Sequence, residues 1–431
     1  MARGQAMADL ENWRKSRGNT LVKNLFAASF AFAFATAFAS SGDFGKDGAP
    51  SFNLPATVFA APGVACNVYY MRVFDSVVPQ RYAFEALCET GSAFGDCWRL
   101  TPKAEQAGKS YRLVLNAWDD TGLVAAGTTT VVIARAPTDE EKGHRITLAL
   151  LGASSTNCRY PDQLLRRMRE AGFSGYTPVG SHCGSSASME RDPAKGALHD
   201  GYGGYAWGTF LTRYALAVDE IDNIQAAAER EQLRSFGEKI PEGQQWRRAL
   251  LRSPLVRLVD GKKTVDVQAW FDKVNGGKAP DYILICLGGN GIFNGRPGED
   301  MKEKVTREIQ NARKLLTLLR AAAPETVIAV GGAFASSADQ DSWGCNYGAM
   351  QSWFFGWKSF NLYGREIERL CRELGDPKIV YVPYGHGVDP LGSYPRGKER
   401  GNALHASREG GLQMGDTLFA WLLNSIEGNL K

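Results

Sequence analysis

Residues 146–171 read ITLALLGASSTNCRYPDQLLRRMREA, and this stretch decides the fold. Ile146–Leu151 is a continuous apolar run, which is typical of a parallel strand buried on both faces. A turn at 152–155 follows, and Asp162–Ala171 then has the amphipathic spacing of a helix. Strand, turn and helix in this order predict the first unit of a parallel α/β sheet.

The same alternation continues toward the end of the chain. Apolar runs predict strands at Tyr282–Leu287, Thr326–Val330 and Lys378–Val382, and helical spacing predicts helices at Asp300–Ala323, Leu362–Leu374 and Gly411–Ile426. Because strands that alternate with helices are joined by right-handed crossovers, we expect a three-layer α/β domain over residues 145–428. Residues 205–275, with the charged helical segment Asp219–Phe236, fit this scheme poorly and are interpreted as an inserted cap or lid.

The chain before residue 135 has a different pattern. Short strand-like runs, separated by Gly, Pro and Asp turn signals, lie at Ala56–Phe59, Asn67–Val73, Tyr82–Cys88, Trp98–Thr101, Ser110–Ala117 and Thr128–Ala134. Such strands bury their alternating faces well in a small sandwich, so we expect an immunoglobulin-like all-β domain over residues 50–135. Trp98 and Trp118 are its expected core aromatics, with ligand stacking as the alternative.

Residues 1–39 have the features of a secretory signal peptide. A basic stretch that includes Arg14 and Lys23 precedes the apolar run Leu25–Ala39, which is shorter than the roughly 20 residues that a membrane-spanning helix needs. A small-x-small motif ending at Ala39 marks the expected cleavage site. We therefore expect an exported protein without a membrane span in the mature chain. An uncleaved N-terminal anchor is the alternative, and it also implies export.

Charge and cysteine content narrow the functional classes. The net charge is +4, from 50 Lys and Arg against 46 Asp and Glu, which gives no basis for nucleic-acid binding. The 8 cysteines form no CxxC pair, so no metal site is indicated, and no organic cofactor is implied either. Cys88 and Cys97 are candidates for a bridge that closes a hairpin, whereas Cys286 is expected to be a buried free thiol.

Three loops after predicted strands or before the last helix carry residues that suit acyl transfer. Active residues of a parallel sheet collect beyond the carboxyl ends of its strands. Ser154 follows the first strand, Asn290 lies in a Gly-rich loop after the second, and His405 precedes the last helix. A helix N-terminus and a carboxamide can hold an oxyanion, and histidine can take a proton near neutral pH. Taken singly, each has a plain structural explanation: an N-cap, a turn, or a core histidine.

In their order and context these residues resemble the SGNH (GDSL-type) hydrolases, whose four blocks supply a serine, a glycine, an asparagine and a histidine. Gly152-Ala153-Ser154 stands where that family has its first block, which implies that Ser154 is the nucleophile, with Ser155 as a neighbouring fallback. The sequence HDGYGGY at 199–205 is similar to the second block of carbohydrate-esterase members, which implies that Gly204 is a backbone oxyanion donor.

The third and fourth blocks complete the resemblance, which extends over residues 145–428. Residues 288–291, reading GGNG, match the third block and imply Asn290 as the side-chain donor. Residues 402–410, reading NALHASREG, stand where the family has its histidine block, and imply His405 as the general base. The implied fold is a flavodoxin-like parallel sheet between two helical layers.

The sequence departs from the family pattern at three positions. Ala153 and Gly291 replace aspartates, and at Gly291 the hydrogen bonds of the missing carboxylate are expected to be lost. Asn402 stands in the place of the acid that orients the histidine, and an amide carries no charge to stabilise an imidazolium. Three explanations are open. Asn402 or a backbone carbonyl orients His405, or Asp389 supplies the acid from another loop, or the protein has lost catalysis.

The resemblance implies an exported serine esterase that hydrolyses small acyl esters, with O-acetyl groups on carbohydrate as the expected substrate. A catalytically impaired glycan-binding or adhesion protein on the same scaffold is the alternative, and a lipase with a preference for long chains is a third. Aromatic residues could wall a sugar or acyl pocket, with core or lid packing as the other interpretation: Trp343, Tyr347, Trp353, Phe354, Phe355 and Trp357.

Overall fold

The computed structural model describes residues 50–76, 79–157, 160–184, 190–213, 253–293, 301–335, 338–347, 352–395 and 404–429. Residues 49–431 form one compact unit. The predicted signal peptide at 1–39 and the charged segment Asp219–Phe236 lie outside the described residues. Both therefore stay predictions, as does the division of the chain into separate domains.

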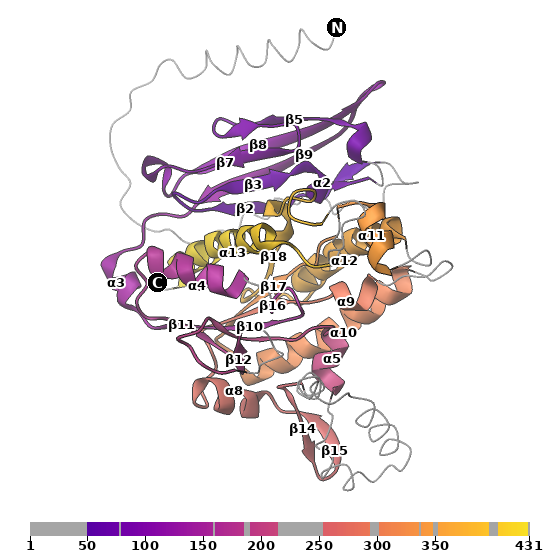
Figure 1. Cartoon of the computed structure of the whole chain (residues 1–431). Helices are drawn as coiled ribbons and strands as arrows, with labels where there is room; N and C mark the ends of the chain where they lie inside the picture. Colours follow the sequence, from indigo (N-terminus) through magenta and orange to yellow (C-terminus); the bar gives the residue numbers. More distant parts are fainter. Residues whose placement is uncertain are drawn as a thin grey trace. The chain divides into compact units, whose positions relative to one another are not determined.

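A seven-stranded sheet forms the centre of the unit (Figure 1). Its strands are β10 (Ile146–Gly152), β11 (Tyr176–Val179), β12 (His182–Cys183), β13 (Leu198–Gly201), β16 (Tyr282–Cys286), β17 (Val327–Gly331) and β18 (Ile379–Val382). They lie in the order β12-β13-β10-β16-β17-β18, and β11 also pairs with β10. Only the short β12–β13 pair among these strands is antiparallel. The predicted mixed α/β architecture with a parallel sheet is confirmed.

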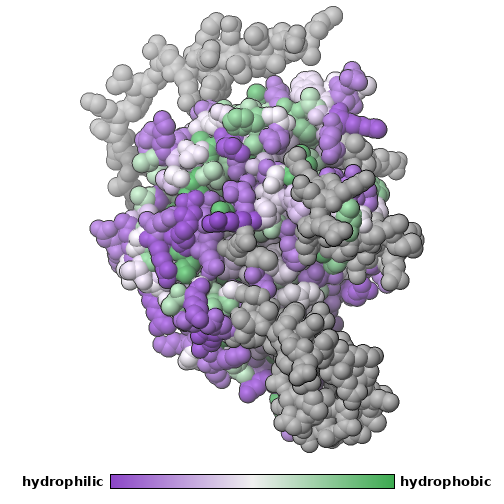
Figure 2. Space-filling model, viewed as in Figure 1, coloured by the Kyte–Doolittle hydropathy of each residue, from purple (hydrophilic) through white to green (hydrophobic). Residues whose placement is uncertain are grey.

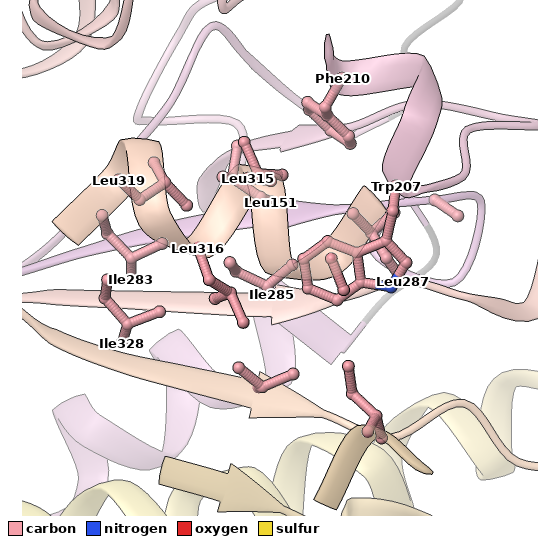
Figure 3. Packing of buried hydrophobic residues seen from close by; sticks show 14 of the residues in the cluster. Leu151, Trp207, Phe210, Ile283, Ile285, Leu287, Leu315, Leu316, Leu319 and Ile328 are labelled. Atoms are coloured by element: carbon pink, nitrogen blue, oxygen red, sulfur yellow. The ribbon is translucent and has the colours of Figure 1, made fainter. Parts of the chain in front are cut away.

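Side chains of the strands alternate between two hydrophobic layers, as the continuous apolar runs predict. Figure 3 shows the first layer, in which Leu316 packs among Leu151, Ile283 and Ile285. This layer is completed by α5 (Trp207–Thr212), α8 (Val267–Asn275), α10 (Met301–Ala322) and α12 (Trp353–Glu373). Each such buried side chain contributes about 1.5–3 kcal/mol to folding before entropy is counted.

The opposite face of the sheet is covered by two helices that pack against each other, α4 (Tyr160–Glu170) and α13 (Arg408–Asn429). Leu148, Leu150 and Leu284 point into this second layer together with Leu164 and Leu418 from the helices. Helices on both faces explain why β10, β16 and β17 carry almost no polar residues.

The N-terminal β region, residues 51–133, contains two main sheets. The first sheet has the order β2-β9-β8-β5, formed by β2 (Thr57–Ala60), β9 (Gly122–Ile133), β8 (Ser110–Asp119) and β5 (Ala83–Leu87). The second has the order β3-β7-β6, formed by β3 (Cys66–Tyr69), β7 (Cys97–Leu100) and β6 (Ser92–Ala93). Val58 and Leu113 of the first sheet share one hydrophobic cluster with Val68 and Trp98 of the second. A small pair, β1 (Ser51–Phe52) and β4 (Phe74–Asp75), lies beside them. An immunoglobulin-like topology stays a prediction.

Three expectations for this region differ from the structure. Residues 70–73 form the short helix α2 (Tyr70–Val73) instead of continuing the strand. Trp98 is buried as expected, but Trp118 is 39% exposed because it alternates with the inward-facing Leu115 and Ala117 of β8. Cys88 and Cys97 are free thiols, so they form no bridge; Cys286 is a buried free thiol, as predicted.

Residues that were interpreted as an insertion form small elements at one end of the sheet. The described part comprises α5, the hairpin of β14 (Val256–Val259) and β15 (Lys262–Val265), and α8. On the face shown in Figure 2, hydrophilic residues are mixed with scattered apolar ones. Within the described ranges, no helix has both the length and the apolar character that crossing a bilayer requires.

Candidate active site

Loops at the carboxyl ends of neighbouring strands surround one small cavity of about 60 Å³ that opens to solvent. Strand register brings these loops together, because Gly152 pairs with Gly201 on one side and with Cys286 on the other. The cavity is lined by Ala153, Ser154, Ser155, Cys286, Leu287, Gly289, Asn290, Phe293, Ala333, Phe334, Phe360, Tyr384, Tyr394 and Leu404. Its walls combine polar and apolar groups, as those of small-molecule sites do.

Ser154 lies in a tight turn directly after β10. The backbone N–H groups of Thr156 and Asn157 both donate to the Ala153 carbonyl, at 3.1 and 3.3 Å. Glycine is required at 152, since a Cβ there would lie 1.7 Å from the Thr156 hydroxyl oxygen. The turn leaves Ser154 partly exposed at the cavity.

Gly204 lies in the loop that follows β13, beside the Ser154 turn. The Tyr202 N–H donates to the Gly152 carbonyl at 3.0 Å, which extends the strand pairing into the two loops. Gly204 has φ +78, and no atom lies within 4 Å of where a Cβ would be. Glycine is therefore favoured here by the backbone conformation, because there is room for a side chain. Among the described residues, no acceptor is bonded to the Gly204 N–H.

Asn290 follows β16 and lines the cavity. Its Nδ2 donates to the Tyr205 carbonyl at 2.9 Å, which ties the third loop to the second. An amide nitrogen carries two hydrogens, so one remains for a bound group. Gly288 has φ +111, and a Cβ there would lie 2.2 Å from the Tyr363 ring, so glycine is required for the approach of Asn290.

A carboxylate that the sequence analysis missed lies against Gly291. A Cβ at Gly291 would be 2.1 Å from Cδ of Glu308, so the Glu308 carboxyl takes the room that a side chain at 291 would need. Its Oε2 accepts from the Trp207 N–H at 3.3 Å, and burial raises its pKa. A carboxylate therefore lies at this point of the loop, but it comes from Glu308 and not from position 291. The available signal was that Glu308 falls in the otherwise apolar stripe of α10, between Val305 and Ala312.

His405 lies next to the cavity-lining Leu404, ahead of α13. Burial lowers its pKa, which favours the neutral imidazole that can accept a proton. Within the described ranges, no residue is hydrogen-bonded to its ring. Asn402 lies outside the described residues. The approach of His405 to Ser154 stays a prediction.

Asp389 follows β18, where its N–H donates to Gln413 Oε1 at 2.8 Å and its carboxylate accepts within its own turn. Its Oδ1 accepts from the N–H groups of Leu391 and Gly392, both at 2.8 Å. Burial and then the charge of Asp389 raise the pKa of Tyr69 in the N-terminal β region to about 12. Its carboxylate therefore acts on that region, and its role toward His405 stays a prediction.

The two histidines near the second block are buried behind its loop. His182 and His199 pack with ring centroids 4.5 Å apart, and His199 Nδ1 accepts from the Gly201 N–H at 3.1 Å. Burial lowers the pKa of His199 to about 3. Asp200, the residue after His199, is fully buried. Its carboxylate oxygens accept hydrogen bonds from the Tyr202 hydroxyl and the Trp270 indole. These residues support the loop and do not line the cavity.

The aromatic wall of the cavity comes from residues other than those expected. Trp343 and Trp357 are buried in the packed interior, and Trp353, Phe354 and Phe355 do not line the cavity either. The side chain of Tyr347 lies outside the described part of the chain. Phe360 of α12 does, together with Phe334 and Tyr394 from the loops after β17 and β18.

Comparison with known proteins gives fold-level likenesses only. No protein-family model and no curated protein matches the chain. A family 3 carbohydrate esterase from Talaromyces cellulolyticus is similar over 66% of this chain and 99% of its own, with 14% identity and a TM-score of 0.39. A carbohydrate acetylesterase from Sinorhizobium meliloti matches 64% of this chain and 98% of its own, with 10% identity and a TM-score of 0.34. An active-site mutant of a family two carbohydrate esterase from Clostridium thermocellum covers 89% of this chain and 96% of its own, with 13% identity and a TM-score of 0.32.

Proposed function

We propose that the protein is an SGNH-type serine esterase that hydrolyses small acyl esters, with O-acetyl groups on carbohydrate as the substrate class. The observation that supports the proposal is one cavity lined by both Ser154 and Asn290, and also by Leu404, the residue before the proposed base His405. Export, predicted from residues 1–39, is part of the same proposal.

In the proposed reaction, Ser154 Oγ attacks the ester carbonyl carbon while His405 takes the hydroxyl proton. The tetrahedral oxyanion accepts hydrogen bonds from the Ser154 and Gly204 N–H groups and from Asn290 Nδ2. Collapse breaks the bond to the alcohol, which leaves with the proton from His405. Water, deprotonated by His405, then attacks the acyl-enzyme, and the acid and free Ser154 are released.

Features of the described residues support these roles. The Asn290 bond to Tyr205 leaves one amide hydrogen, and the Gly204 N–H has no acceptor among the described residues. The Asn290 amide is thus held before substrate arrives, so its reorganisation costs little in the transition state. The lowered pKa of His405 keeps it unprotonated at neutral pH.

We propose a serine–histidine dyad in which Asn402 or a backbone carbonyl accepts the Nδ1–H of His405. Asp389 is the weaker choice, because its Oδ1 already accepts from two backbone N–H groups of its turn. Without a charged partner, less stabilisation of the imidazolium is expected than in a full triad.

Turnover of p-nitrophenyl acetate by wild type, Ser154→Ala and Ser155→Ala tests the proposal. Ser155 is the matched control, since it lines the same cavity one residue away. We expect Ser154→Ala to lose the enzyme-catalysed rate by about 10³-fold or more and Ser155→Ala to stay near wild type. Equal rates for wild type and Ser154→Ala would remove the esterase function. Activity that falls with longer acyl chains separates this enzyme from a lipase.

A further inference from the structure

One side chain of the N-terminal β region, Arg72 of α2, reaches the wall of the cavity. Its Nε donates to the Val388 carbonyl at 3.0 Å, and its Nη1 donates to the Ala335 carbonyl. Those two carbonyls belong to the loops after β18 and β17, which are separate in sequence. One guanidinium therefore ties two loops at the cavity rim to each other and to the β region.

The same guanidinium lies against two aromatic rings of the cavity. Its Cζ is 4.9 Å from the ring centroid of Phe334 and 5.5 Å from that of Tyr394. Both rings line the cavity. Arg72 is half-buried, and two carbonyls, two ring faces and the charge of Asp389 stabilise its cation. The position of the rings is thus coupled to the position of Arg72.

A second, independent contact joins the β region to α12. Asp75 is paired with Arg365 and with Lys358 at 3.4 Å, and it accepts from Asn361 Nδ2 at 3.1 Å. The helix that carries these partners also carries Phe360, a third aromatic residue of the cavity. Two of the described contacts of the β region therefore act on elements that form the wall.

We propose that the N-terminal β region is a working part of the esterase site, in which Arg72 is a positioning residue that sets the aromatic wall formed by Phe334 and Tyr394. This inference rests on the proposed function and adds a role for the β region. The wall receives the apolar or ring-shaped part of the ester, so Arg72 acts on substrate binding more than on the bond-making step.

Kinetics of Arg72→Met with p-nitrophenyl acetate test this role. We expect KM to rise about tenfold with kcat changed by less than about threefold, since ring placement and not the nucleophile is altered. Arg72→Lys keeps the charge but cannot form both carbonyl bonds, so an intermediate KM is expected. Arg99→Met is the matched control, because Arg99 bonds Asn67 at 2.6 Å within the β region and lies over Phe94. A loss of kcat at unchanged KM would overturn the proposal.

A measurement without substrate separates this inference from the proposed function. We expect amide hydrogen exchange in peptides covering 333–335 and 388–394 to become faster in Arg72→Met and to stay unchanged in Arg99→Met. If Ser154→Ala kept full activity, the esterase function would fail while this exchange result still decided whether Arg72 holds the wall. Unchanged exchange in both loops would refute the inference. If Arg72→Met does not fold, Arg72→Lys is read in the same two assays.

Discussion

The oxyanion side and the base side of the cavity are held in different ways. On the oxyanion side, each loop is bonded to the next, Tyr202 to Gly152 and Asn290 to Tyr205. On the base side, the Ser407 N–H donates to the Ser393 carbonyl at 2.8 Å, but in the described part of the chain His405 itself accepts and donates nothing. The proposed anion donors are therefore held by hydrogen bonds between neighbouring loops, whereas the proposed base has no such bond among the described residues.

The largest effect is expected on the base side. We predict that His405→Ala lowers kcat for p-nitrophenyl acetate by about 10²–10⁴-fold, the usual contribution of a general base. His144→Ala is the control, because His144 is 43% exposed, pairs with Glu140 at 3.8 Å and precedes β10, whereas Ser154 follows the other end of that strand. Equal kcat values for the two variants would assign the base to another residue.

The pH profile of wild type sharpens the same point. Burial lowers the pKa of His405 from its ordinary value of 6.5, so the acidic limb of kcat/KM should lie below pH 6.5. A carboxylate hydrogen-bonded to His405 would have the opposite effect, because it favours the charged imidazolium. An acidic limb above pH 6.5 would therefore indicate a charged partner such as Asp389.

Next in size is the oxyanion side. We expect Asn290→Ala to lower kcat by about 10²–10³-fold, which is what loss of one oxyanion donor costs. Asn290→Asp should be at least as impaired, since a carboxylate repels the developing charge. Asn116→Ala serves as the control, because Asn116 is half-buried and bonded to Glu85 at 2.8 Å in the β region. An Asn290→Ala enzyme with wild-type kcat would remove this residue from the oxyanion hole.

Acid should weaken the oxyanion side through the buried His199. Its folded pKa of about 3 lies below the ordinary 6.5, so the unfolded chain binds the proton more readily and stability falls as pH drops below 6.5. Between pH 7 and pH 5 the loss is about 2 kcal/mol. Urea unfolding at both pH values checks this loss. In His199→Asn, the loss of stability between the two pH values should be smaller by about 2 kcal/mol. A wild-type midpoint that does not change with pH would contradict the expected burial.

The parallel strands and the loops after them could be predicted from sequence because their signal is local. The apolar runs that became β10, β16 and β17 are continuous, and the loops after β10 and β16 hold Ser154 and Asn290. The strand β13 has no such signal, since Leu198–Gly201 contains His199 and Asp200; it is a strand because it pairs with the end of β10.

Tertiary contacts account for the rest that sequence reasoning missed. Arg72 was placed in a strand, and nothing in its neighbours indicates that it reaches the loops at Ala335 and Val388. Glu308 lies 17 positions after Gly291, on a helix whose packing brings the two together. Such pairs depend on how elements pack, so a pattern along the chain does not reveal them.

The smallest effect, and the one that best tests how the oxyanion side is held, concerns Glu308. Glu308→Ala leaves the Trp207 N–H without its acceptor, which should cost about 1–3 kcal/mol of stability and lower kcat by about tenfold through Asn290. Glu308→Gln keeps an acceptor oxygen.

Burial raises the folded pKa of Glu308 above its ordinary value of 4.5. Stability therefore falls as the pH rises from 4.5 through the folded pKa, because the buried carboxyl must then ionise. Glu308→Gln avoids this cost, so at pH 7 it should be at least as stable as wild type. Glu303→Ala, on the exposed face of the same helix, is the control. Urea midpoints and kcat of the three variants decide the matter: if Gln and Ala at 308 were equally damaging, the charge and not the hydrogen bond would hold the loop.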